Sequence, residues 1–276
     1  MKSSRRNFIQ SLGMVGAGIG ISAETFAHSS ENSAFPKPNG DDQQLFVGDD
    51  IAVTKTEYGK VRGFILRGIN QFLGIPYGAD TSGKNRFMPP QKPAPWVDIR
   101  PTLWWGNSAP QIMEKRYANT YASFVDHWNY DDVSEDCLKI NVWTPAIDTQ
   151  KRPVLVWLHG GGFVNGNAIE QDGYHGENIS RLGNIVFCSL NHRLGALGYT
   201  HLKAAGGHPA SGNVGNLDMV LALEWVKNNI VNFGGDPSNV TIMGQSGGGS
   251  KVTTLMNMPS AKGLFHKAVV LSGGSL

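Results

Sequence analysis

Short apolar runs separated by glycine- and proline-rich turns dominate the chain from residue 51 onward. Their lengths are typical of buried strands, and strands are predicted at Val61–Leu66, Gln71–Ile75, Lys139–Thr144, Val154–His159, Ile185–Leu190, Val240–Met243 and Ala268–Ser272. Between them, the segment Leu217–Ile230 has helical spacing, with one apolar face formed by Leu217, Val220, Leu221, Trp225 and Val226. Strands that alternate with helices predict an α/β fold, with a mostly parallel central sheet and helices on both faces.

The N-terminal residues follow a different pattern. Ser4–Ile9 contains two adjacent arginines, and a weakly apolar, glycine-rich stretch follows at Leu12–Ile21. This layout predicts a twin-arginine signal peptide over residues 1–27, cleaved after Ala27. The apolar stretch is too short for a transmembrane helix, which is the weaker alternative. The polar residues 28–50 predict a linker that need not be ordered, and the whole pattern predicts export to the periplasm or the extracellular space.

Composition narrows the possible functions of the remaining domain, residues 51–276. The chain is 40% hydrophobic and 17% charged, which is typical of a globular protein with a sizeable core. Its net charge of +2 comes from scattered residues without a basic stripe, so no nucleic-acid partner is expected. No metal-ligand spacing occurs, so no metal and no cofactor are predicted. Cys188 lies in an apolar run and is expected to be a buried thiol; nothing in the pattern requires a Cys137–Cys188 bridge.

Candidate chemistry begins at Gly244–Gly248, a G-x-S-x-G sequence centred on Ser246. The predicted strand Val240–Met243 runs into its first glycine, and Ser250–Met258 predicts a helix that ends at Pro259. A sharp turn between a strand and a helix exposes the serine Oγ for nucleophilic attack. Glycines two residues before and after the serine are needed because side chains there would collide. The motif alone also fits a flexible loop, but its context favours a nucleophile.

A second glycine-rich motif lies at Val154–Phe163, where an apolar strand runs directly into three consecutive glycines. Backbone N–H groups of such a loop stabilise the oxyanion that forms when a serine attacks an ester carbonyl. An ordinary turn after a core strand is the alternative. His159 stands at the end of the strand, where we expect a structural hydrogen bond rather than the role of catalytic base.

These segments resemble the type-B carboxylesterases, the family that includes para-nitrobenzyl esterases, animal carboxylesterases and cholinesterases. Phe233–Gly248 is similar to the serine signature of that family, and Ser134–Pro145 to its second signature. The segments Gly74–Tyr77, Asn191–Gly195 and Gly212–Asp218 occur in the expected order, so the resemblance covers roughly residues 50 to 276.

The resemblance implies an α/β-hydrolase fold and the hydrolysis of a small-molecule carboxylic ester. It implies that Ser246 forms the acyl-enzyme, and that Gly161, Gly162 and Gly247 supply the N–H groups of the oxyanion hole. It implies no metal or cofactor, and no membrane partner after the signal peptide is cleaved.

The chain departs from the family pattern at several positions. Gln245 stands where a glutamate is usual, and Gly247 where an alanine is usual. Lys139 replaces the usual aromatic residue or threonine of the second signature. Ala109 occupies the place of the cysteine that normally pairs with Cys137. An aromatic group (Trp96, Trp104 and Trp105) fits either an acyl pocket or, more commonly, a packed surface loop.

The catalytic acid and histidine of the family lie beyond Leu276. We therefore expect a fold truncated after the strand that follows the nucleophile helix, and a chain that is inactive by itself. If the chain ends at Leu276, the outer edge of Ala268–Ser272 has no partner, and poor solubility is expected. His266 leads into this strand and is not expected to act as the base; the other histidines are His28, His127, His159, His175, His192, His201 and His208.

Three interpretations remain open. The chain is the N-terminal part of a secreted carboxylesterase, it pairs with a separately encoded C-terminal half, or it is a non-catalytic binding relative. Relatives of the third kind tend to lose the serine or the glycines of the elbow. This chain keeps both, which favours the first two interpretations.

Overall fold

The computed structural model describes residues 44–112, 132–206 and 208–274. The chain divides into two units, Met1–Lys37 and Pro38–Leu276, and every described residue belongs to the second. The predicted signal peptide lies outside the described residues, as does the predicted linker up to residue 43. The last residues of that linker contribute a short strand, β1, to the main sheet.

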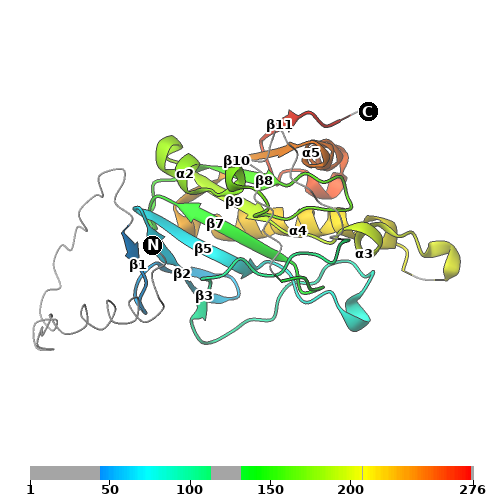
Figure 1. Cartoon of the computed structure of the whole chain (residues 1–276), viewed down its shortest axis with the longest axis horizontal. Coiled ribbons are helices and arrows are strands. Elements are labelled where there is room, and N and C mark those ends of the chain that lie inside the picture. Colours follow the sequence, from blue (N-terminus) through cyan, green and yellow to red (C-terminus); the bar gives the residue numbers. More distant parts are fainter. Residues whose placement is uncertain (1–43, 113–131, 207, 275–276) are drawn as a thin grey trace, which may run out of the picture. The chain divides into compact units, whose positions relative to one another are not determined.

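The second unit is built on an eight-stranded sheet with the order β1-β4-β5-β7-β9-β8-β10-β11 (Figure 1). The sheet is antiparallel from β1 to β9 and parallel from β9 to β11. The predicted parallel arrangement therefore describes the half of the sheet that carries Ser246. The strands are β1 (Leu45–Phe46), β4 (Phe64–Leu66), β5 (Ile69–Pro76), β7 (Lys139–Thr144), β8 (Arg152–Leu158), β9 (Val186–Leu190), β10 (Gly235–Gln245) and β11 (Lys267–Leu271).

A smaller three-stranded sheet joins β2 (Val53–Thr56), β3 (Gly59–Arg62) and β6 (Arg100–Pro101). The prediction of one strand over Val61–Leu66 is wrong, because β3 and β4 belong to different sheets. The chain changes sheets at Gly63, whose N–H donates to Ala52 O over 2.9 Å. A Cβ at this glycine would lie 2.1 Å from a backbone oxygen of β5, so the close approach requires glycine here.

Helices cover both faces of the sheet, as predicted. Val156 and Leu158 of β8 belong to the larger core cluster, which includes seven of the 16 residues of α4 (Val214–Asn229). Trp157, which points to the other face because side chains alternate along a strand, packs against a second cluster around Trp143. The loop that begins α2 (Glu177–Gly183) contacts that second cluster.

Helix α4 is not amphipathic, contrary to the sequence prediction. It is buried on nearly all sides, including at Asp218, Met219 and Leu223, while Leu217 is only half-buried. The sheet lies on one side of α4, and α3 (Gly195–Tyr199) and α5 (Gly247–Asn257) contact its other sides. A helix covered on nearly all sides has no exposed polar face, so the periodicity of its apolar residues does not predict its burial.

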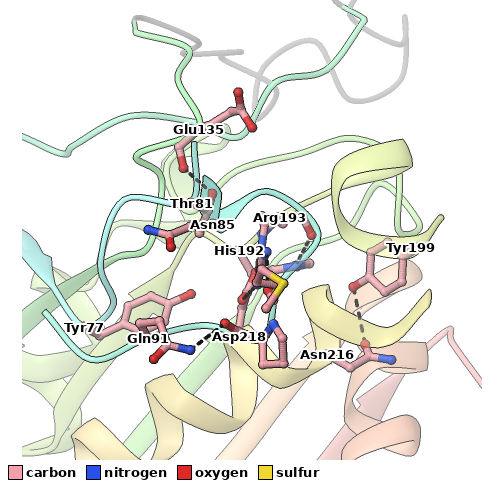
Figure 2. Close-up of polar contacts among 12 residues, drawn as sticks. Tyr77, Thr81, Asn85, Gln91, Glu135, His192, Arg193, Tyr199, Asn216 and Asp218 are labelled. Carbon is pink, nitrogen blue, oxygen red and sulfur yellow. Dashed lines mark hydrogen bonds and ion pairs between the residues drawn. The ribbon is translucent and has the colours of Figure 1, made fainter. Parts of the chain in front are cut away.

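A buried ion pair ties α4 to the loop that follows β9. Asp218 Oδ2 accepts hydrogen bonds from Arg193 N (3.0 Å) and Nε (2.8 Å), and its Oδ1 accepts one from Nη2 (2.6 Å). Figure 2 shows the two side chains facing each other, beside the hydrogen bond between Tyr199 and Asn216. Arg193 Nη1 also donates to Met88 O over 2.8 Å. One guanidinium therefore joins three segments that are distant in the sequence.

The described part of the chain also contains short 3-10 helices, and none of its helices is both long and apolar enough to cross a bilayer. The 3-10 helices are η1 (Gly83–Asn85), η2 (Asp172–Tyr174), η3 (Lys203–Ala205), η4 (Ser211–Asn213), η5 (Ile230–Phe233) and η6 (Pro259–Ala261).

Strand β11 is exposed, although its apolar sequence predicted a buried strand. It pairs with β10, and no other described strand pairs with it. Val269, Val270 and Leu271 expose 37%, 39% and 37% of their surface. The contacts of β11 with β10 and α5 cover these side chains only in part, which is why their hydrophobicity does not correspond to burial.

Both cysteines, Cys137 and Cys188, are free and fully buried. The predictions of a buried Cys188 thiol and an unpaired Cys137 are confirmed. Ala109, in the position of the usual partner, packs in the same core cluster as Cys137. Burial raises the pKa of both thiols, so they stay protonated.

Candidate functional site

Ser246 occupies a sharp turn between β10, which ends at Gln245, and α5, which begins at Gly247. Its φ of 55° and ψ of −122° are strained for a residue with a side chain. The residue is exposed, and its N–H donates to Leu271 O over 2.8 Å. The predicted strand, turn and helix are therefore present, with the serine raised at the tip of the turn.

Close packing explains the glycines around Ser246. A Cβ on Gly244 would lie 2.4 Å from the carbonyl carbon of Gly248, and one on Gly248 would lie 2.1 Å from Leu158 O. A Cβ on Gly247 would lie 2.2 Å from Gly162 N. Side chains would collide at all three positions; the sequence analysis predicted this for Gly244 and Gly248, and not for Gly247.

The structure brings the predicted oxyanion glycines to the elbow. Gly161 and Gly162 have φ values of 81° and 66°, which place consecutive residues in the left-handed region. Gly162 N lies against Gly247, and a Cβ on Gly160 would lie 3.9 Å from the Ser246 Cβ. In the described part of the chain, no backbone carbonyl accepts a hydrogen bond from the N–H of Gly161, Gly162 or Gly247. These donors remain available to an external oxygen.

The loop that carries these glycines is held by residues that the sequence analysis did not single out. Gln111 Nε2 donates to Gly166 O (3.0 Å), and Gly166 N donates to Gln111 Oε1 (2.9 Å). Gly195 N donates to Phe163 O over 2.8 Å. Each contact is long-range in sequence, so no local pattern indicated it.

Lys251 is a buried charged residue beneath the same loop, and the sequence analysis missed it. Its side chain is fully buried, and Nζ donates to His159 O over 2.9 Å. Burial lowers the pKa of Lys251 to about 7. The sequence contained one indication of this role: Lys251 is the one charged residue of α5, and it follows Ser246 by five positions.

None of the described histidines is hydrogen-bonded to Ser246. His159 Nδ1 lies 2.9 Å from Gly160 O, which confirms the predicted structural hydrogen bond, and its ring stacks on His192 at 5.1 Å. His266 Nδ1 accepts from Val240 N over 3.1 Å. This contact is made at the middle of β10, six residues before Ser246. His28 and His127 lie outside the described residues.

A cavity of about 540 Å³ lies beside the elbow and is large enough for a small organic ester. It is lined by Phe163, Ser250, Thr253, Thr254, Asn257, Met258 and Gly274. The predicted aromatic group does not line it. Trp96 packs against Tyr58 and Trp105 against Trp143, whereas Trp104 is 60% exposed. No group of three potential metal ligands occurs among the residues that the structure describes.

Comparisons with known proteins agree with this geometry. The family model described as "Carboxylesterase family" matches residues 50–276. A para-nitrobenzyl esterase of Bacillus subtilis (strain 168) is 39% identical over 223 residues, which cover 81% of this chain and 44% of that protein. A medium-chain fatty acyl-CoA hydrolase precursor of Anas platyrhynchos is 40% identical over 230 residues, covering 79% of this chain and 40% of that protein.

Solved structures show the same relationship. An esterase of Clostridium hathewayi, described as hydrolysing aliphatic aromatic polyesters, matches with a TM-score of 0.74 and 41% identity, over 81% of this chain and 44% of that chain. A Geobacillus stearothermophilus carboxylesterase matches with a TM-score of 0.71 and 38% identity, over 79% of this chain and 43% of that chain.

The predicted α/β-hydrolase fold is thus confirmed, and the chain spans less than half the length of the relatives it matches. The family match begins at residue 50, close to the predicted start of the domain, and includes the elbow and the oxyanion loop. The chain belongs to the carboxylesterase family.

Proposed function

We propose that Ser246 is the nucleophile of a carboxylic ester hydrolase. Its Oγ forms a bond with the ester carbonyl carbon, its proton passes to a base, and the alcohol leaves. Water then hydrolyses the acyl-enzyme and releases the acid. The oxyanion is stabilised by the N–H groups of Gly161, Gly162 and Gly247. The observation that carries this proposal is the strained, exposed Ser246 beside these available donors.

In this proposal, the catalytic acid and histidine lie in the C-terminal half that longer members of the family have. The open edge of β11 supports this assignment, because a further parallel strand would pair there and cover the exposed Val269 and Val270. That half either continues the polypeptide or is a separately encoded partner. The 276 residues alone lack a base for Ser246 among those described, so we expect them to be inactive as an esterase.

Export by the twin-arginine route is part of the same proposal. The adjacent Arg5 and Arg6 and the glycine-rich stretch after them support it. Two free, buried thiols are compatible with folding before export, since no disulfide has to form afterwards. Cell fractionation of the full chain, with an Arg5→Lys/Arg6→Lys variant as control, tests the route.

Covalent labelling tests the nucleophile without requiring turnover. The full chain, combined with the C-terminal portion of a similar carboxylesterase, incubated with a fluorophosphonate and digested for mass spectrometry, is expected to carry the label on Ser246, because the added portion supplies the base. Ser246→Ala is expected to lose it, and Ser250→Ala, four residues along in the same region, to keep it. Equal labelling of the Ser246→Ala chain would reject Ser246 as the nucleophile.

Complementation tests the missing half. The C-terminal portion of a similar carboxylesterase, added to the full chain, is expected to raise Ser246-dependent hydrolysis of p-nitrophenyl acetate. General acid–base catalysis contributes about 10²–10⁴-fold, which is the size of increase expected. Appreciable Ser246-dependent turnover by the chain alone would show that a base lies within these residues.

A further inference from the structure

A single cation lies directly under the oxyanion loop. Lys251 Nζ donates to His159 O over 2.9 Å, and it lies 3.5 Å from both Gly160 O and His159 Nδ1. The side chain is fully buried in α5, which begins just after the nucleophile. A lysine is rarely buried without a specific partner, and these partners are the carbonyl groups immediately before Gly161.

The geometry of the peptide group couples this lysine to the proposed site. Gly160 O and the N–H of Gly161 belong to one planar trans peptide, so they point in opposite directions. The oxygen is held at 2.9 Å by His159 Nδ1, and Lys251 Nζ lies 3.5 Å from both groups, so the lysine and the histidine together fix the direction of the N–H on the other side. A cation near the oxygen also polarises the amide, which makes its N–H a stronger donor.

We propose that Lys251 is a positioning residue that orients and polarises the Gly160–Gly161 peptide, so that the oxyanion hole is stronger when Lys251 is protonated. The inference rests on the proposed function of Gly161. It assigns no proton transfer to Lys251, whose ammonium is directed at the carbonyl groups.

Three titratable side chains act on this lysine or respond to it. His159, at the end of β8, contacts Nζ directly. Glu170 raises the pKa of Lys251, but burial outweighs this effect and lowers the pKa to about 7. His192, which stacks on His159, has a pKa well below its usual range because of its burial and the charge of Lys251. Below pH 7 Lys251 is mainly charged, and above pH 7 it is mainly neutral.

Nuclear magnetic resonance tests the coupling without using catalysis. The backbone amide signal of Gly161 in the full chain is expected to shift with a midpoint near pH 7. In Lys251→Met this transition is expected to be absent, although His159 is still present. A Gly161 amide without a transition near pH 7, or with the same transition in Lys251→Met, would overturn the proposal. If the variant does not fold, a wild-type Gly161 amide without a transition near pH 7 still overturns the proposal.

The labelling rate of Ser246, measured with the C-terminal portion of a similar carboxylesterase present to supply the base, provides the second measurement. At pH 6 we expect the wild type to react about 10-fold faster than Lys251→Met, less than the 10²–10³-fold for removing an oxyanion donor. The ratio is expected to approach one above pH 8. If Ser246 is labelled at the same rate in the wild type and in Lys251→Met at every pH, the proposed role of Lys251 is rejected while the proposed function stands. A wild-type Ser246 that stays unlabelled while the Gly161 amide titrates rejects the proposed function instead.

Discussion

Replacement of Gly248 by alanine is expected to lower the free energy of unfolding by about 3 kcal/mol or more, and to remove the reactivity of Ser246. The new Cβ would lie 2.1 Å from Leu158 O, a backbone atom that no side-chain rotation can move away. Helix α5 and strand β8 would have to separate. Leu158 ends β8 just before the oxyanion loop, so the displacement reaches Gly161 and Gly162 as well as the serine.

Gly173→Ala is the matched control for this change. Gly173 lies in the short helix η2, and a Cβ there meets no atom within 4 Å. The free energy of unfolding of Gly173→Ala is expected to stay the same or to rise slightly, because alanine restricts the conformations of the unfolded chain. Urea unfolding and fluorophosphonate labelling measure both effects. Equal behaviour of Gly248→Ala and Gly173→Ala would refute the steric explanation of the elbow glycines.

Asp218→Asn is expected to cost about 3–5 kcal/mol of stability. The Arg193 and Asp218 side chains are only 2% and 0% exposed, so the change leaves a buried cation without its counter-ion. The loop after β9 and the segment at Met88 would lose their common anchor. Thermal and urea unfolding, compared with the wild type, measure the loss.

Two further variants separate the ion pair from a general effect of charge. Glu135→Gln breaks the pair between Glu135 and the solvent-exposed Arg86, and little change is expected because water replaces the partner. Asp218→Leu combined with Arg193→Met removes both buried charges and is expected to recover part of the stability. A double variant less stable than Asp218→Asn would contradict this account.

The sequence was sufficient to predict the elements that carry Ser246. Strand β7 has the predicted bounds, and β8, β9 and β10 lie where the apolar runs indicated. These strands are central, so their hydrophobicity reflects burial on both faces. The elbow was predictable for a different reason: an apolar strand runs into the glycines around Ser246, and the close packing of a sharp turn leaves no room for side chains at Gly244 and Gly248.

Features that depend on tertiary contacts were not predictable in this way. The split between β3 and β4 comes from the approach of β5 to Gly63, and the burial of α4 on nearly all sides comes from neighbours distant in the sequence. Lys251 looked like an ordinary polar residue of a helix. Its burial and its contacts with the oxyanion loop become visible only when α5 is packed against the end of β8.

The contact between β11 and the elbow has a consequence for the order of events during synthesis. Ser246 N donates to Leu271 O, and a Cβ on Gly273 would lie 2.0 Å from Ser246 O. The turn that strains Ser246 is therefore closed from outside by Leu271 and Gly273, which are synthesised 25 and 27 positions later. A nascent chain released from the ribosome only as far as α5 lacks this brace. The strained turn at Ser246 is expected to close only after the following strand has emerged and paired with β10.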